Sequence, residues 1–252
     1  MWRTLMERGL IVAMLGAAGA AMADTRQFTE DFPIEECQFR AYGGNPFFNL
    51  TPGRQAYFTN QRCVAAGDCD ELEELWITVT SQTRTVTLRD DGQTRNIPTR
   101  VVQEYETADG DLVEISRNYF STCWPDRDVY YFGEEVDIYE DGRIVSHDGA
   151  WLAGRRGAEP GIIMPDRAFL LGSRYFQELA TDIAEDRAEH VGVDLDINVP
   201  AGSFEECVRI NETSPLEPGH VSKKAYCPGI GLVRDGELEL NAIYDNGVPP
   251  TP

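Results

Sequence analysis

The chain has 252 residues and a formal net charge of −21, because 43 acidic residues outnumber 22 basic ones. So negative a protein repels nucleic acids and anionic membrane surfaces, which argues against a nucleic-acid partner and favours a cation or a basic partner. High solubility is the simpler explanation of the charge. Without its first 23 residues the chain is long enough for one large all-β domain or two small domains.

The first predicted element is a secretory signal peptide over residues 1–23. Two arginines precede a short apolar stretch, which ends in an A-x-A sequence at residues 21–23, just before Asp24. This arrangement is typical of a signal peptide with its cleavage site. A membrane anchor is the alternative, but the stretch is short and rich in Gly and Ala, which suits a bilayer span poorly. We therefore expect an exported, soluble protein, periplasmic or secreted, with no membrane insertion.

The cysteines agree with export. They are Cys37, Cys63, Cys69, Cys123, Cys207 and Cys227. An even number of cysteines behind a signal peptide indicates disulfides, here three. A metal site is the alternative, but the chain has no C-x-x-C, and its three histidines lie far from the cysteines in sequence. Cys63 and Cys69 are spaced to close a small loop.

The remainder of the chain alternates between strand-like runs and Asp-Gly turns. Asp-Gly is a strong hairpin signal because both residues tolerate positive φ. The turns are Asp91-Gly92, Asp109-Gly110, Asp141-Gly142, Asp148-Gly149 and Asp235-Gly236. The runs, many of them rich in β-branched and aromatic residues, are 75–89, 94–107, 112–121, 129–139, 144–147, 174–180, 188–199, 204–213, 221–226 and 231–240.

This pattern predicts an all-β fold with little helix. We expect a single antiparallel domain over residues 24–244, either a strongly curved sheet (an open barrel) or a β-sandwich. Only residues 176–188 are suited to a helix. Residues 149–172 are the least regular stretch and are predicted to be a long ordered loop. Residues 245–252 are predicted to be a flexible tail.

The first hairpin whose register can be predicted is acidic. With residues 141–142 as a two-residue loop, His147 falls opposite Val136. His147 then lies on the more apolar face of the hairpin, near Glu134, whereas Asp137 lies on the opposite face.

The second such hairpin contains two cysteines. A turn around residues 217–219 sets Cys207 opposite Cys227, and a cross-strand disulfide fits that spacing. By exclusion, Cys37 pairs with Cys123 and ties the N-terminal segment to the sheet.

The acidic hairpin is the candidate metal site, with Glu134, Asp137 and His147 as candidate ligands. Converging carboxylates suit a hard cation, and a histidine extends the choice to transition metals. A divalent cation is therefore the candidate cofactor. Because the carboxylates are split between two faces, a complete shell needs outside ligands, and a solvated acidic hairpin is the alternative. No catalytic residue can be named, since the chain has no G-x-S-x-G, H-E-x-x-H, P-loop or complete dinucleotide fingerprint.

The aromatic residues suggest a second candidate site, for a small ligand. The candidate ligand-binding residues are Tyr131, Tyr139, Trp151 and Met164. We expect the loop at residues 149–172 to lie across the aromatic face of the sheet, with Trp151 and residues 162–164 turned inward. Core packing is the simpler interpretation, and a groove that binds a small ligand between sheet and loop is the functional one.

Several stretches resemble a widespread family of exported bacterial β-rich proteins that ends in a Y-x-P-G-[IV]-G-L-V motif. They include N-P-F-F-N-L-T-P-G at residues 45–53, V-Y-Y-F-G-E-E-V-D-I-Y at 129–139, G-A-W at 149–151, P-G-I-I-M at 160–164, V-P-A-G-S-F at 199–204 and Y-C-P-G-I-G-L-V at 226–233. The resemblance implies an exported β-rich protein and carries over no catalytic residue. The closing motif is also similar to that of envelope proteins with open, half-barrel β folds. The chain departs from the family by inserting the loop with Cys63 and Cys69.

The sequence thus favours an exported, non-enzymatic protein that binds a small ligand, a cation or a protein partner. The alternative is a metal-dependent enzyme or metalloprotein that uses residues 126–148 with His147. A purely structural partner protein is the third interpretation.

Overall fold

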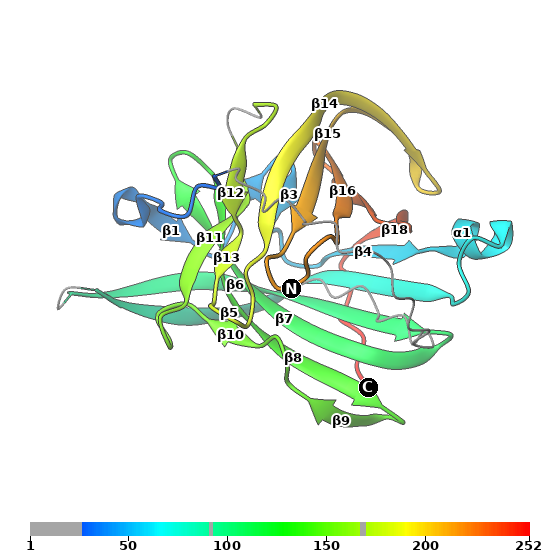
Figure 1. The fold of residues 1–252 in the computed structure, drawn as a ribbon, viewed down its shortest axis with the longest axis horizontal. Coiled ribbons are helices and arrows are strands. Elements are labelled where there is room, and N and C mark those ends of the chain that lie inside the picture. Colours follow the sequence, from blue (N-terminus) through cyan, green and yellow to red (C-terminus); the bar gives the residue numbers. More distant parts are fainter. Residues whose placement is uncertain (1–26, 91–92, 167–169) are drawn as a thin grey trace, which may run out of the picture.

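The structure is a computed structural model that describes residues 27–90, 93–166 and 170–252. It has the predicted all-β fold: one antiparallel sheet, with thirteen strands along its main path, is nearly closed into a barrel (Figure 1). The predicted signal peptide and the predicted turn at residues 91–92 lie outside the described residues, so both remain predictions.

In chain order, the described elements of the N-terminal half are η1 (Ile34–Glu36), β1 (Gln38–Arg40), β2 (Gly44–Asn45), β3 (Phe48–Asn49), β4 (Arg54–Thr59), α1 (Gln61–Ala66), β5 (Glu73–Asp90), β6 (Gln93–Ala108) and β7 (Asp111–Trp124). Those that follow are β8 (Val129–Glu140), β9 (Arg143–Ser146), β10 (Trp151–Leu152), β11 (Glu159–Met164), β12 (Arg174–Phe176), β13 (Glu178–Leu179), β14 (Arg187–Val199), β15 (Gly202–Thr213), β16 (Ser222–Cys227), β17 (Gly231–Asp235) and β18 (Leu238–Asp245).

The sheet follows the chain over most of its width because short turns join neighbouring strands. Its order is β12-β14-β15-β16-β17-β18-β4-β5-β6-β7-β8-β11-β13, with β1, β9 and β10 paired at the side. At two predicted turns both residues have positive φ: 49° and 89° at Asp109 and Gly110, and 50° and 71° at Asp141 and Gly142. Such turns match the twist of the strands that they join, which explains the long hairpins.

A single segment, residues 174–179, brings the two ends of the sheet together. Its first half, β12, pairs with β14, and its second half, β13, pairs with β11 at the other end of the sheet. Gln177 lies buried at the junction, where its side-chain amide donates to Oε1 of Glu212 at 2.8 Å. Gly161 of β11 faces the same segment, and a Cβ there would lie 2.3 Å from the carbonyl oxygen of Phe176. Glycine at this position therefore allows the two ends to approach.

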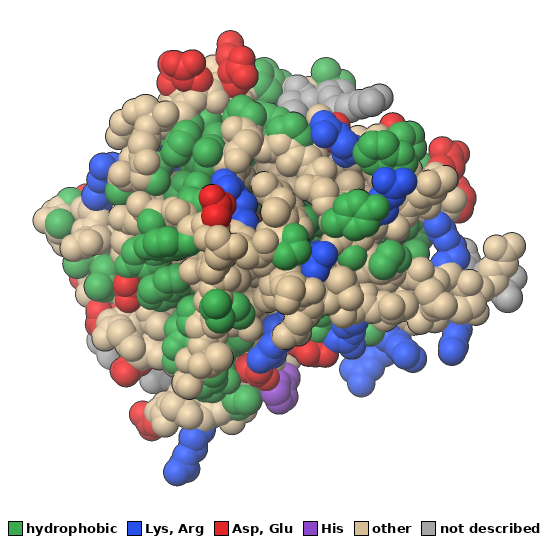
Figure 2. Space-filling view, turned by 180° about the vertical axis from the view of Figure 1, so that it is seen from behind, with side chains coloured by type: hydrophobic (Ala, Val, Ile, Leu, Met, Phe, Trp, Pro, Cys, Tyr) green, Lys and Arg blue, Asp and Glu red, His purple; other side chains and the backbone are tan. Residues whose placement is uncertain are grey.

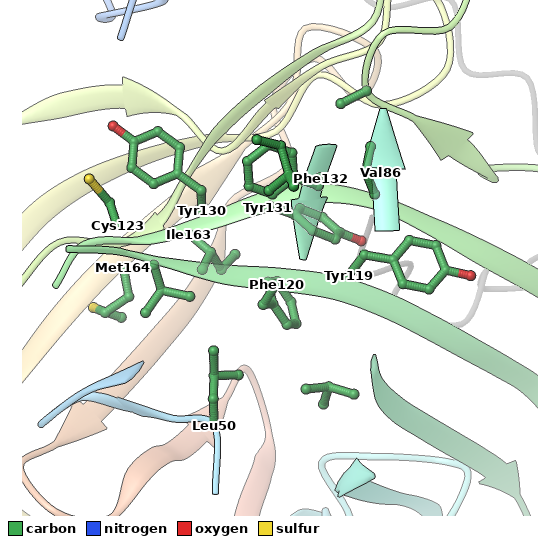
Figure 3. Packing of buried hydrophobic residues seen from close by; sticks show 14 of the residues in the cluster. Leu50, Val86, Tyr119, Phe120, Cys123, Tyr130, Tyr131, Phe132, Ile163 and Met164 are labelled. Atoms are coloured by element: carbon green, nitrogen blue, oxygen red, sulfur yellow. The ribbon is translucent and has the colours of Figure 1, made fainter. Parts of the chain in front are cut away.

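Side chains pack on both sides of β7 and β8. Figure 3 shows Phe120 and Tyr130 projecting to opposite sides of these strands. On the outer side the ring of Phe39 meets Tyr130 edge-on, with 5.3 Å between centroids. On the inner side Phe48 meets Phe120 at 4.8 Å. The N-terminal segment thus covers the outside of the barrel, while the β2–β3 turn fills part of its interior.

The three predicted disulfides are confirmed as Cys37–Cys123, Cys63–Cys69 and Cys207–Cys227. The predicted register of the second hairpin is also confirmed, since Val208 pairs with Tyr226. The Cα atoms of Cys207 and Cys227 lie 4.2 Å apart, close to the spacing of a non-hydrogen-bonded pair. Three disulfides indicate that the protein folds in an oxidising compartment outside the cytoplasm.

The predicted helix at residues 176–188 is wrong. The segment forms β12, β13, a tight turn in which the amide of Ala180 donates to the carbonyl of Ala184, and the start of β14. Pairing with β11 and β14 outweighs the local helix preference. The short helix α1 lies instead in the Cys63–Cys69 loop and ends at Gly67, which has a φ of 80°.

The stretch at residues 149–172 is not one continuous loop. Its β10 and β11 pair with β8, so the stretch widens the sheet instead of lying across its face. Trp151, Ile163 and Met164 are buried, as predicted, and Ile162 is half-buried.

The C-terminal residues 245–252 lie against the barrel. The side-chain amide of Gln55 on β4 donates to the carbonyl of Val248, and that of Gln103 on β6 donates to the carbonyl of Pro250, both at 2.9 Å. These contacts attach the segment that the sequence predicts to be flexible.

Candidate ligand pocket inside the barrel

The acidic hairpin of β8 and β9 departs from its predicted register by one residue. The pairing is as predicted next to the turn. Val145 then forms a bulge, so that Ser146, and not Val145, lies opposite Ile138. A bulge of one residue moves every following side chain to the other face of the strand. His147 therefore lies beside Asp137, and its predicted position near Glu134 is wrong.

The three candidate metal ligands do not converge. Nδ1 of His147 lies 3.0 Å from Oδ1 of Asp137, and the histidine side chain is 67% exposed. Asp137 also accepts a hydrogen bond from Arg117 at 3.0 Å. Glu134 is buried and lies on the other face of β8. Within the described ranges, no group of three or more His, Cys, Asp and Glu residues has the arrangement of a metal site.

The four aromatic and sulfur candidates are divided between two places. Tyr131 and Trp151 meet edge-on, with 5.2 Å between ring centroids, and Met164 is buried in the same hydrophobic cluster. Tyr139 is buried on the other face of β8, near Asp137 and Arg117. The structure therefore brings three of the four into one core and separates the fourth.

A pocket opens into the interior of the barrel beside the β2–β3 turn. Its cavity volume is about 70 Å³, within about 600 Å³ of empty space that includes solvent at the pocket mouth. Its lining residues are Phe47, Phe48, Asn49, Arg54, Ala56, Phe58, Ile77, Val79, Val102, Glu104, Tyr226, Ile230, Gly231 and Leu232. Most of these side chains are apolar, and they come from strands far apart in sequence. None of the four predicted ligand-binding residues lines the pocket.

Hydrogen bonds to backbone atoms hold the rim of the pocket together. Oδ1 of Asn45 accepts from the amides of Phe47 and Phe48, both at 3.0 Å, while its Nδ2 donates to the carbonyl of Met164 at 3.0 Å. Across the rim, the amide of Gly229 donates to the carbonyl of Pro46 at 2.7 Å. The two stretches that carry much of the sequence resemblance, residues 45–53 and 226–233, thus meet at this rim.

Among the described residues that line the pocket, Glu104 is the one with an acidic side chain. It is 5% exposed, and its Oε1 accepts a hydrogen bond from Nδ2 of Asn118 at 3.0 Å. Oδ1 of Asn118 in turn accepts from the hydroxyl of Tyr131 at 2.5 Å. Burial raises the pKa of Glu104 to about 8, although the positive charge of Lys224 opposes the shift. Glu104 is therefore mostly neutral at pH 7.

Lys224 occupies the interior next to the pocket residue Tyr226. Its side chain is fully buried, and Nζ lies 2.6 Å from Oε2 of Glu212 and 3.5 Å from Oδ2 of Asp235. Burial lowers the pKa of Lys224, but the carboxylates of Asp235 and Glu212 outweigh burial and raise it. Because Glu212 also accepts the hydrogen bond from Gln177, it links Lys224 to the segment that closes the barrel.

One face of the molecule carries both acidic and basic side chains. On the face shown in Figure 2, acidic and basic side chains are scattered, and hydrophobic side chains form several separate groups. On this face several basic side chains gather at the lower right of the view, while acidic ones lie mainly at the top and lower left.

Sequence reasoning missed Glu104, Asn118 and Tyr226 as site residues. In the run at residues 94–107, both alternating faces carry apolar and polar residues, so alternation alone does not identify the interior face. The only signal was the pair of resembling stretches at residues 45–53 and 226–233, which contain seven of the lining residues.

Comparison with known proteins adds no relative: no protein-family model, curated protein or solved structure matches the chain. The resemblance described above therefore remains a prediction. Within the described part of the chain, no helix is both long and apolar enough to cross a membrane.

Proposed function

We propose that this protein is a non-enzymatic binding protein that holds a small, largely apolar ligand in the pocket inside its barrel. The observation that carries the proposal is the pocket wall, where side chains such as Phe58, Val79, Val102 and Leu232 face one open space. Ligand pockets are typically concave and mostly apolar, with a few polar groups that fix orientation. Arg54, Glu104 and Tyr226 are polar groups of this kind.

Binding is favoured over catalysis by the chemistry of the wall. The described lining residues include no histidine, cysteine or serine, and Glu104 is hydrogen-bonded to an amide rather than paired with a nucleophile. A general acid or base normally works beside a second reacting group in the site. A hydrogen-bonded rim and an apolar wall suit retention of a ligand.

We further propose that the protein works in the periplasm or is secreted. The three disulfides support an oxidising compartment, and the predicted signal peptide supports export. A protein partner that delivers or receives the ligand agrees with this location.

A fluorescence titration tests the proposal. N-phenylnaphthylamine is a neutral, apolar dye that brightens in apolar surroundings, and we expect saturable binding to the intact protein. Ala56→Phe, which places a ring in the pocket, should abolish binding. The matched control Val145→Phe adds the same ring on the exposed strand β9 and should bind like the wild type.

Melting temperatures of the three proteins check that each is folded. The proposal fails if the wild type does not bind the dye, or if folded Ala56→Phe binds it as well as the control does.

A further inference from the structure

The oxygen atoms of Glu104 are used unequally. Oε1 accepts from Asn118 Nδ2 at 3.0 Å, whereas Oε2 has no hydrogen-bond partner among the described residues. Because Glu104 lines the pocket, its second oxygen is the atom of this carboxyl group left for a ligand. A ligand that forms a hydrogen bond with a carboxyl group in an apolar pocket gains affinity from it.

The neighbouring residues fix which atom of Glu104 carries a proton. The hydroxyl of Tyr131 donates to Oδ1 of Asn118, so the amide group of Asn118 must turn its NH₂ towards Glu104. Oε1 is therefore an acceptor. When the carboxyl group is neutral, its proton lies on Oε2, and Glu104 presents an O–H donor to the pocket.

We propose that the ligand combines an apolar body with a neutral hydrogen-bond acceptor, such as a carbonyl or ether oxygen, that accepts the proton of Glu104 Oε2. This inference rests on the proposed function, because it uses the same pocket. The apolar walls contact the body of the ligand, and Glu104 fixes its orientation.

The charges around Glu104 agree with a neutral carboxyl group. Among the described residues, the charged groups that act on it most are Lys224 of β16, Glu134 of β8 and Glu114 of β7. The two carboxyl groups raise the pKa of Glu104 and the lysine lowers it, but burial is the largest effect and keeps the pKa at about 8. A ligand that carries an ammonium group is the alternative, and it requires ionised Glu104.

A pair of dyes separates these possibilities. Prodan is an apolar ketone whose emission moves to longer wavelength when its carbonyl accepts a hydrogen bond, and N-phenylnaphthylamine has no carbonyl. Glu104→Leu removes the donor, Glu104→Gln keeps one, and Glu106→Leu is a matched control on the same face of β6 that does not line the pocket.

We expect Glu104→Leu to weaken prodan binding about tenfold and to shift its bound emission to shorter wavelength. Glu106→Leu should bind both dyes like the wild type, and Glu104→Gln should restore most of the prodan affinity that Glu104→Leu loses. The ratio of prodan affinity to N-phenylnaphthylamine affinity should fall in Glu104→Leu alone. Wild-type affinity for prodan should fall above about pH 8 as Glu104 ionises, whereas that of Glu104→Gln should not change.

The outcomes distinguish the two proposals. If neither dye binds, the proposed function fails. If N-phenylnaphthylamine binds but prodan affinity is the same in Glu104→Leu as in the wild type, only the present inference fails. It also fails if dodecylammonium displaces N-phenylnaphthylamine more strongly as the pH rises through about 8 in the wild type but not in Glu104→Gln, because the ligand class is then cationic.

Discussion

Gly161 on β11 lies so close to Phe176 on β12 that a Cβ at residue 161 would stand 2.3 Å from the Phe176 carbonyl oxygen. The same Cβ would lie 2.6 Å from the carbonyl oxygen of Gln177. Both neighbours are backbone atoms, which cannot turn away as a side chain does. The contact joins the two ends of the sheet, so the closure of the barrel depends on the absence of a side chain at one position.

Gly161→Ala should therefore lower the free energy of unfolding by about 2–4 kcal/mol, the range of a severe overpacking effect. Gly110→Ala is the control, because its Cβ meets nothing within 4 Å and only its φ of 89° is unfavourable. That strain costs about 1–2 kcal/mol. Urea unfolding measures both variants, and an equal loss in the two would contradict the role of close approach at Gly161.

The disulfides should differ in their effect according to the loop that each closes. The sequence separations are 86 for Cys37–Cys123, 20 for Cys207–Cys227 and 6 for Cys63–Cys69. In the chain-entropy model, replacing both cysteines with alanine should cost about 4.5, 3 and 2 kcal/mol respectively. Denaturant unfolding of the three double variants gives the order. If the Cys63–Cys69 variant proved the least stable, loop length would not be what governs the effect.

Stability should fall as the pH rises, because Glu104 holds its proton in the folded protein. Its pKa is about 8 when folded, against an ordinary value of 4.5 for a glutamate. Between these values the unfolded chain has released the proton and the folded chain has not, so the free energy of unfolding decreases by about 1.4 kcal/mol per pH unit from this group. Above the folded pKa the decrease from Glu104 ends.

Glu104→Gln removes this contribution, while other buried acids continue to act in both proteins. The difference in stability between Glu104→Gln and the wild type should therefore grow in favour of the variant from about pH 5 to about pH 8. Denaturation at several pH values provides the comparison. Parallel stability curves for the two proteins would mean that the pKa of Glu104 is not raised.

The pair of exposed His147 and half-buried Asp137 should contribute little to stability or metal binding. Ion pairs at the protein surface give about 0–1 kcal/mol, and the His147 side chain is exposed, so His147→Ala should change the free energy of unfolding by less than about 0.5 kcal/mol. Calorimetric titration with Zn²⁺, Ca²⁺ and Cu²⁺ should show weak binding at most, because Glu134 lies on the other face of β8. Submicromolar binding that His147→Ala abolishes would overturn this assignment.

The two hairpins show how far sequence reasoning reaches. In the second, the turn alone sets the register, and Cys207 pairs with Cys227 as predicted. In the first, the turn is also correct, but the bulge at Val145 cannot be read from local preferences because it depends on how β9 fits against the edge of β8. A shift of one residue then reverses which side chains His147 meets.

The pocket was harder to predict than the fold. Alternation of apolar and polar residues identifies strands, and it gave the all-β class and most strand positions. It does not identify the interior of a barrel when both faces of a strand carry apolar and polar residues. Glu104 faces the interior because the sheet curls and closes through residues 174–179, a relationship between distant segments that no local pattern contains.

The measurement that tests the central claim most directly is a methyl NMR titration of the folded protein with N-phenylnaphthylamine. Ile77, Val79, Val102, Ile230 and Leu232 line the pocket, whereas Ile144 and Val145 are exposed on β9. Binding inside the barrel predicts that the methyl signals of the five pocket residues shift together and saturate while those of β9 stay in place. Shifts confined to exposed methyl groups, with the pocket signals unmoved, would contradict the account.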